Sequence, residues 1–249
     1  MEEKRIHLMD ELRGLAVLCM VFHHALLSIG DIFRSQFFIN AFNSLHILQP
    51  IFWLLFFGIS GVSSRLSKNN LKRGLILFGI ALVTTAVTYA FFNGRSTIVF
   101  GVLHFLSLAI IIFHFIKPLF NKINPIVGSV VSLALFAFTY EVYKGYVGIF
   151  DFVQYRLPRA LYSSKYLFWI GFPKLGFRSA DYFPLIPFIF LFFIGCFLGK
   201  YVKDGKLPKL AYKKRCGFLS FMGRRALIIY LAHQPIIYAV CYLVKWIFF

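Results

Sequence analysis

Seven apolar segments recur along this chain, and they constrain its fold more than any other feature. They cover residues 12–30, 47–66, 74–93, 98–117, 125–142, 183–203 and 225–247. A helix of about 20 apolar residues spans the roughly 30 Å hydrocarbon core of a bilayer. The sequence therefore predicts an all-α fold, a polytopic transmembrane bundle of about seven helices formed by a single domain over residues 1–249.

The composition excludes a soluble globular domain. Hydrophobic residues make up 59% of the chain and charged residues only 14%, whereas ordinary soluble domains are about half apolar. In a membrane protein the net charge of +18 is explained by lysines and arginines in cytoplasmic loops. An N-terminus on the inside places 18 of the 27 basic residues in inner loops, so the predicted orientation is N-in/C-out. No basic stretch interleaved with exposed aromatics is found, and nucleic-acid binding is not expected.

The first apolar segment contains ionisable residues at membrane depth. Arg13 and His24 are eleven positions apart, which places them about 20° apart around a helix and about 16 Å apart along it. The adjacent His23 points about 100° away from this face. Ionisable groups inside a membrane are costly and usually functional, so His24 is a candidate catalytic residue. A hydrogen bond from His24 to a neighbouring helix is the structural alternative.

Two further histidines lie in later apolar segments. In the N-in orientation His104 and His24 both lie about 9 Å below the outer ends of their helices, which suggests one common outward-opening cavity. His233 begins a His-Gln-Pro triplet in the last segment. Pro235 lacks an N–H and interrupts the helical hydrogen bonds, which a membrane helix tolerates only where protein or water surrounds it. A purely structural role stays open for both histidines.

Basic and aromatic residues outside the apolar segments allow two interpretations each. Lys72 and Arg73 follow the second segment and either anchor it on the cytoplasmic side or contact an anionic ligand. The basic loop 200–225 suits anionic headgroups or a nucleotide phosphate. Loop 144–182 has the aromatics and arginines of a sugar-binding lid or of an interfacial belt. The four cysteines are isolated, so neither a disulfide framework nor a metal site is predicted.

Three stretches of the chain form a recognisable set. The first is Asp-Glu-Leu-Arg-Gly-Leu-Ala at 10–16, followed by His24; the second combines 57–64 with 100–104; the third is Tyr-Leu-Ala-His-Gln-Pro at 230–235. Together they resemble the heparan-alpha-glucosaminide N-acetyltransferase catalytic-domain family, in particular its compact bacterial members. Four residues after the first-helix histidine, where bacterial relatives often have an aspartate, this chain has Ser28.

The resemblance implies acetyl transfer across a membrane. Acetyl-CoA would supply the acetyl group from the cytoplasm, and an amino group of an extracytoplasmic sugar or glycoside would accept it. A membrane histidine would act as base or as acetyl carrier, with His24, His104 and His233 as candidates. Cytoplasmic cations would bind the charged head of the coenzyme, and the candidates are Arg13, Arg65, Lys72, Arg73, Arg224 and Arg225.

Two alternatives differ in chemistry from this prediction. An O-acyltransferase acting on surface polysaccharide shares the opening motif and would form esters in place of amides. A proton-coupled transporter would use the membrane histidines as a relay, although no internal repeat of the kind common in transporters is visible. The resemblance further implies a multi-pass protein of a bacterial cytoplasmic membrane, with the bilayer and a glycan as partners, and leaves a homodimer open.

Overall fold

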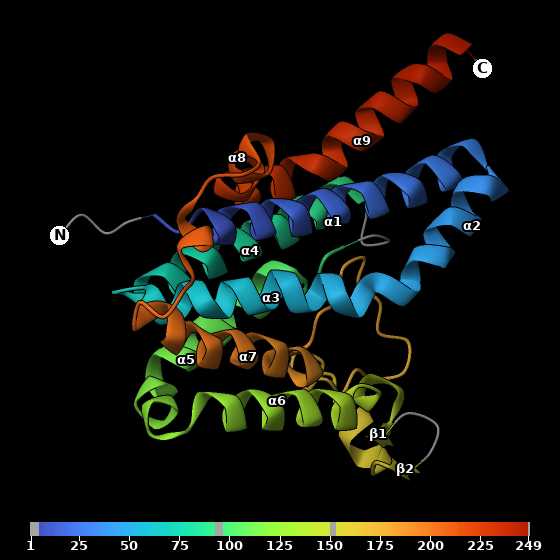
Figure 1. The fold of residues 1–249 in the computed structure, drawn as a ribbon. Helices are drawn as coiled ribbons and strands as arrows, with labels where there is room; N and C mark the ends of the chain where they lie inside the picture. Colours follow the sequence, from blue (N-terminus) through green and yellow to red (C-terminus); the bar gives the residue numbers. More distant parts are fainter. Residues whose placement is uncertain (1–4, 93–96, 150–152, 249) are drawn as a thin grey trace. The chain divides into compact units, whose positions relative to one another are not determined.

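The computed structural model describes residues 5–92, 97–149 and 153–248. It divides the chain into two compact units, the first formed by Met1–Ile59 with Leu207–Phe249 and the second by Ser60–Lys206. In the described residues, seven helical segments are long and apolar enough to cross a membrane (Figure 1). This confirms the predicted all-α polytopic fold, whereas the N-in/C-out orientation and the single domain stay predictions.

The first unit is built around α1 (His7–Phe33), which is longer than the apolar segment predicted for it. α1 ends where Arg34 adopts a left-handed conformation with φ 52°, and the Arg34 N–H bonds the Gly30 carbonyl. The helices α8 and α9 both pack along α1 (Figure 1). The remaining elements of this unit are α2 (Gln36–Ser44), η1 (Leu45–Leu48), the first part of α3 (Gln49–Leu66), η4 (Lys209–Tyr212), α8 (Gly217–Arg224) and α9 (Ala226–Phe248).

The second predicted span proves to be longer than its apolar core. The elements α2, η1 and α3 follow one another without a break, and together they form the candidate span Gln36–Leu66. The prediction began only at residue 47, because residues 36–46 contain several polar side chains that lower the local hydropathy. Helical structure therefore begins earlier than the apolar pattern indicates.

The second unit contains two packed helix pairs. α4 (Asn70–Phe92) packs against α5 (Val102–Lys122), and α6 (Pro125–Thr139) packs against α7 (Leu185–Lys203) (Figure 1). Phe105, Phe113 and Phe192 are fully buried between these helices. These side chains fill the space between α5 and α7, so the two helices supply much of the core of this unit.

The long loop before α7 has structure of its own. Strands β1 (Tyr146–Ile149) and β2 (Val153–Arg156) form an antiparallel hairpin that the all-α prediction did not include. Val, Ile and Tyr, which favour strands, make up most of β1 and half of β2; β1 is partly buried and β2 is exposed. Elsewhere in the loop the Tyr182 hydroxyl donates to the Phe168 carbonyl over 2.6 Å. Burial raises the pKa of the Tyr182 phenol above its ordinary value, so it stays a donor.

Candidate active site

Asp10 and Glu11, the acidic residues of the opening motif, hold the N-terminal part of α1. This is the end of the helix predicted to face the cytoplasm. Glu11 is buried, and its Oε1 accepts hydrogen bonds from the backbone N–H groups of Arg215 at 2.7 Å and Cys216 at 2.9 Å. Cys216 is the residue before α8, so Glu11 caps the start of that helix. Asp10 forms ion pairs with Arg5 at 2.8 Å and with Arg13 at 3.7 Å.

Gly14 allows α8 to approach α1 closely. A Cβ atom at this position would overlap the backbone carbonyl of Leu219 in α8. No side-chain movement relieves a clash with backbone, so the glycine of the motif has a packing reason. The motif therefore positions α1 against α8.

His24 of α1 is bonded to Gln234 of α9. The Gln234 amide nitrogen Nε2 donates to His24 Nδ1 over 2.8 Å. The Ser28 hydroxyl, one turn further along α1, lies 3.4 Å from Gln234 Oε1. An amide nitrogen only donates, so the neutral His24 ring has its proton on Nε2. His24 therefore does form a hydrogen bond to a neighbouring helix, as the structural alternative to catalysis supposed. This bond uses only one of the two ring nitrogens.

His233 lies beside His24 with the opposite arrangement of its proton. The two ring centroids are 5.1 Å apart, and His233 is 8% exposed. His233 Nδ1 donates to the Tyr230 carbonyl over 2.5 Å. A carbonyl only accepts, so Nε2 of the neutral ring has a free lone pair. Nε2 is buried and has no hydrogen-bond partner among the residues that the structure describes.

Two further histidines, His23 and His46, continue the row of rings from His24, and His46 is exposed. The His23 ring lies 6.2 Å from the His24 ring and 5.8 Å from the His46 ring, measured between centroids. His23 Nε2 is 3.2 Å from the amide nitrogen of Gln49. Neither histidine is among the site residues predicted from the sequence, because His23 points away from His24 around the helix and His46 lies outside the three stretches of the family resemblance. Within the described ranges, no group of three or more His, Cys, Asp or Glu residues is arranged to hold a metal ion.

His104 belongs to the second unit, where it caps α5. The Gly101 N–H donates to His104 Nδ1 over 3.3 Å, and Nε2 lies 3.2 Å from the Thr85 hydroxyl. That hydroxyl donates to the Ile98 carbonyl over 2.6 Å, so His104 Nε2–H is its donor. Both ring nitrogens are therefore used in holding the start of α5. The cavity predicted to join His104 with His24 stays a prediction, because the two units are described separately.

The predicted coenzyme-binding cations also divide between the units. In the first unit Arg13 is paired with Asp10, and Arg224 and Arg225 are exposed. In the second unit Lys72 is exposed and Arg73 is partly exposed at the start of α4. Arg65 differs from all of these, because its side chain is buried.

A comparison with protein families gives a match over nearly the whole chain. Residues 5–235 match the family described as heparan-alpha-glucosaminide N-acetyltransferase, catalytic. The chain belongs to this family. Comparisons with curated proteins and with solved structures give no significant match. Membership in the N-acetyltransferase family confirms the resemblance of the three sequence stretches and makes the chain a membrane-embedded acetyltransferase by family.

Three polar residues of this acetyltransferase have roles that depend on contacts distant in the sequence. Gln234 lies inside the His-Gln-Pro triplet, but only its contact with His24 gives it a role. Ser28 was noted as a departure from the usual aspartate, and the structure places it next to Gln234. Glu11 lies within the opening motif, and its capping partners are more than two hundred residues away in the chain. No sequence spacing indicates such long-range partners.

Proposed function

We propose that this acetyltransferase moves an acetyl group from cytoplasmic acetyl-CoA to an amino group of an extracytoplasmic sugar or glycoside. We further propose that His233 is the base and that His24 is a hydrogen-bond donor to the reacting carbonyl. The protein would act in the cytoplasmic membrane of a bacterium. The observation that supports this assignment is the opposite placement of the ring protons in two adjacent histidines.

His233 has the arrangement that a general base requires. Its Nδ1–H is held by the Tyr230 carbonyl at 2.5 Å, and its buried Nε2 has a free lone pair. A neutral imidazole of this tautomer accepts a proton from a nucleophile as it attacks. The same lone pair would also allow His233 to attack the thioester itself and form an acetyl-imidazole intermediate.

His24 is suited to the complementary role. The Gln234 amide occupies its Nδ1, so Nε2–H is available as a donor next to the His233 ring. A donor held in place before the reaction stabilises the negative charge that develops on a carbonyl oxygen. Ser28 supports this arrangement by its contact with the Gln234 carbonyl oxygen.

The proposed reaction balances with these two groups. The acceptor nitrogen forms a bond to the acetyl carbon while His233 Nε2 takes one proton from that nitrogen. The carbonyl oxygen then reforms its double bond, and the bond between acetyl carbon and sulfur breaks. The leaving thiolate takes the proton from His233 and departs as free coenzyme A. The products are an N-acetylated sugar and the thiol, with both histidines in their starting state.

The test is acetyl transfer by the purified protein in lipid nanodiscs, with acetyl-CoA and glucosamine, followed by mass spectrometry of the product. We expect an amide product in the wild type. His233→Ala should lower kcat by about 10²–10⁴-fold, the usual contribution of a general base. His24→Ala should lower it by about 10²–10³-fold, as for loss of an oxyanion donor.

The matched control is His114→Ala, because His114 is an exposed histidine of α5 outside this site. It should retain wild-type activity. Full activity of folded His233→Ala would exclude His233 as base or carrier. Base-labile ester products would identify an O-acyltransferase instead. A rapid quench that traps acetylated His233 would select the covalent route over general-base catalysis.

A further inference from the structure

Arg65 is a buried guanidinium whose hydrogen bonds are incomplete. It lies near the end of α3 and is 4% exposed. Its Nη2 donates to Asn121 Oδ1 of α5 over 2.7 Å. Its Nε and Nη1 atoms are buried and have no hydrogen-bond partner in the part of the chain that the structure describes. A guanidinium has five N–H donors and no acceptor, and buried donors without partners are costly.

The Arg65 side chain does not extend into water, and packing against neighbouring helices holds it in place. A Cβ atom at Gly199 of α7 would lie 2.7 Å from Arg65 Cβ, so the glycine lets the two helices meet at this residue. The stem of Arg65 is therefore confined between α7 and α5. The Arg65 guanidinium is buried, whereas Asn121, which accepts its hydrogen bond, is exposed.

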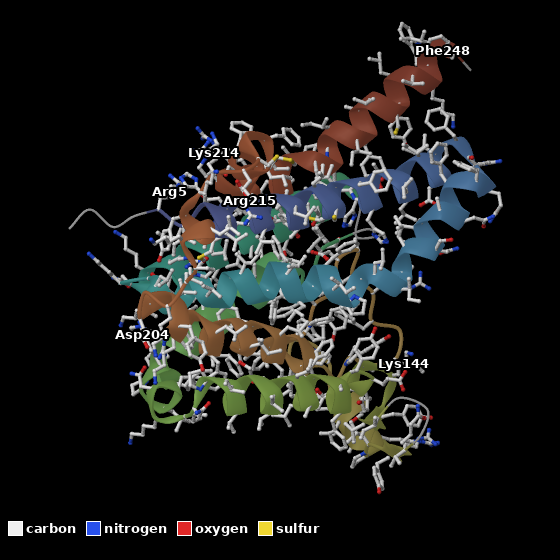
Figure 2. All side chains as sticks on the ribbon, viewed as in Figure 1. Arg5, Lys144, Asp204, Lys214, Arg215 and Phe248 are labelled. Carbon is white, nitrogen blue, oxygen red and sulfur yellow. The ribbon has the colours of Figure 1, made fainter. Side chains whose placement is uncertain are left out.

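The charges around Arg65 favour an anion. Lys117 of α5 lies close enough to Arg65 and to Lys203 of α7 for like-charge repulsion. Asp204, which is exposed at the end of α7 (Figure 2), attracts Arg65 electrostatically. Cys196 also lies near Arg65, and this fully buried thiol contributes no charge when protonated. Among the residues that the structure describes, these three cations and the exposed Asp204 carboxylate leave an excess of positive charge.

We propose that Arg65 and Asn121, together with Lys117 and Lys203, form a binding site for a phosphate group of coenzyme A. The planar guanidinium presents its N–H groups in a geometry that matches two phosphate oxygens. The lysines add charge at the exposed side, and the Asn121 amide contributes a donor of its own. The cation site rests on the contacts of Arg65, whereas the identity of its occupant rests on the proposed function.

The test measures coenzyme A binding by calorimetry to the full chain in nanodiscs of neutral phosphatidylcholine. Arg65→Lys keeps the charge but removes the planar fork, and it should weaken binding by about tenfold, the usual worth of a charge-assisted hydrogen bond. Lys117→Gln should weaken binding severalfold and provides a second variant if Arg65→Lys does not fold. The matched control is Lys122→Gln, at the same end of α5 and exposed, which should bind as the wild type does.

The outcomes separate the site from the reaction and from a lipid. Unchanged coenzyme A affinity in both folded variants would overturn the proposal. Native mass spectrometry that shows loss of bound phosphatidylglycerol in those variants, with unchanged coenzyme A affinity, would also overturn it and assign the site to a lipid headgroup. Arg65-dependent binding without acetyl transfer would contradict the proposed function alone. Acetyl transfer with an unchanged KM for acetyl-CoA in Arg65→Lys would contradict this site alone.

Discussion

Gln234 determines which nitrogen of His24 has the proton. Its amide nitrogen donates to His24 Nδ1, and its oxygen faces the Ser28 hydroxyl. The neighbouring His233 is fixed by a main-chain carbonyl of its own helix, which no side-chain substitution removes. The two histidines are therefore different chemical groups, although their residue types are identical. Gln234 is in this sense a positioning residue, because it acts through His24.

Gln234→Glu should invert the tautomer of His24. A carboxylate only accepts hydrogen bonds, so His24 would place its proton on Nδ1 and lose the Nε2–H donor. We expect kcat to fall by about 10²–10³-fold, as for loss of an oxyanion donor, with little change in thermal stability. Nitrogen chemical shifts of labelled histidine should show the change of tautomer directly.

Gln36→Glu is the matched control for this charge change, because Gln36 is an exposed residue of α2. It should retain both activity and the wild-type histidine shifts. An active Gln234→Glu protein whose His24 proton has moved to Nδ1 would show that the Nε2–H donor is not needed.

At the scale of elements, the packing of α1 against α8 organises the first unit. Glu11 holds the start of α8 by two backbone hydrogen bonds, and Gly14 lets the helix backbones meet. Close approach at small residues is a common basis of helix association in membranes, where apolar side chains gain little by leaving lipid. Both residues lie about three to four turns before His24 on α1, so this contact holds the helix that presents the histidine.

Gly14→Ala should destabilise the protein, because the added methyl group would overlap the Leu219 carbonyl. Overpacking of this kind costs about 1–3 kcal/mol. Gly79→Ala is the control, since a Cβ atom there meets nothing within 4 Å. That replacement in the interior of α4 should be neutral or stabilise by about 0.5–1 kcal/mol. Unfolding in mixed detergent micelles measures both, and equal stability of the two variants would contradict the close packing of α1 and α8.

At the scale of the whole molecule, charge rather than packing predicts the orientation. The N-in arrangement places 18 of the 27 basic residues in inner loops. It also places Arg65 and Lys203 on the cytoplasmic side, where coenzyme A is available, and the loop with the β1–β2 hairpin on the outside. The proposed phosphate site and the proposed sugar acceptor therefore both depend on this orientation.

Cysteine labelling in right-side-out vesicles tests the orientation. The four native cysteines would be replaced, and single cysteines introduced at Lys165 and at Lys206, both of which are exposed. A membrane-impermeant maleimide should label Lys165→Cys in intact vesicles and Lys206→Cys only after permeabilisation. The reverse pattern would establish an N-out protein and remove the basis for a cytoplasmic phosphate site at Arg65.

The sequence alone determined the number and approximate position of the membrane helices. The reason is physical: an apolar segment in lipid must satisfy its backbone hydrogen bonds internally, so length and hydropathy suffice to predict a helix. The opening Asp-Glu-Leu-Arg-Gly-Leu-Ala stretch with His24, the stretches 57–64 and 100–104, and the Tyr-Leu-Ala-His-Gln-Pro stretch together predict the family. The pairing of β1 with β2 is not predicted, because strands of four residues are too short to give a clear alternating pattern.

Only the tertiary structure decided what each polar residue does. His24, His104 and His233 are equivalent as sequence candidates, yet one is bonded by Gln234, one caps α5, and one has a free buried nitrogen. Arg65 was one of six candidate cations until its burial and its single bond to Asn121 set it apart. Hydrogen bonds between side chains depend on distances between helices, and residue order along the chain does not specify those distances.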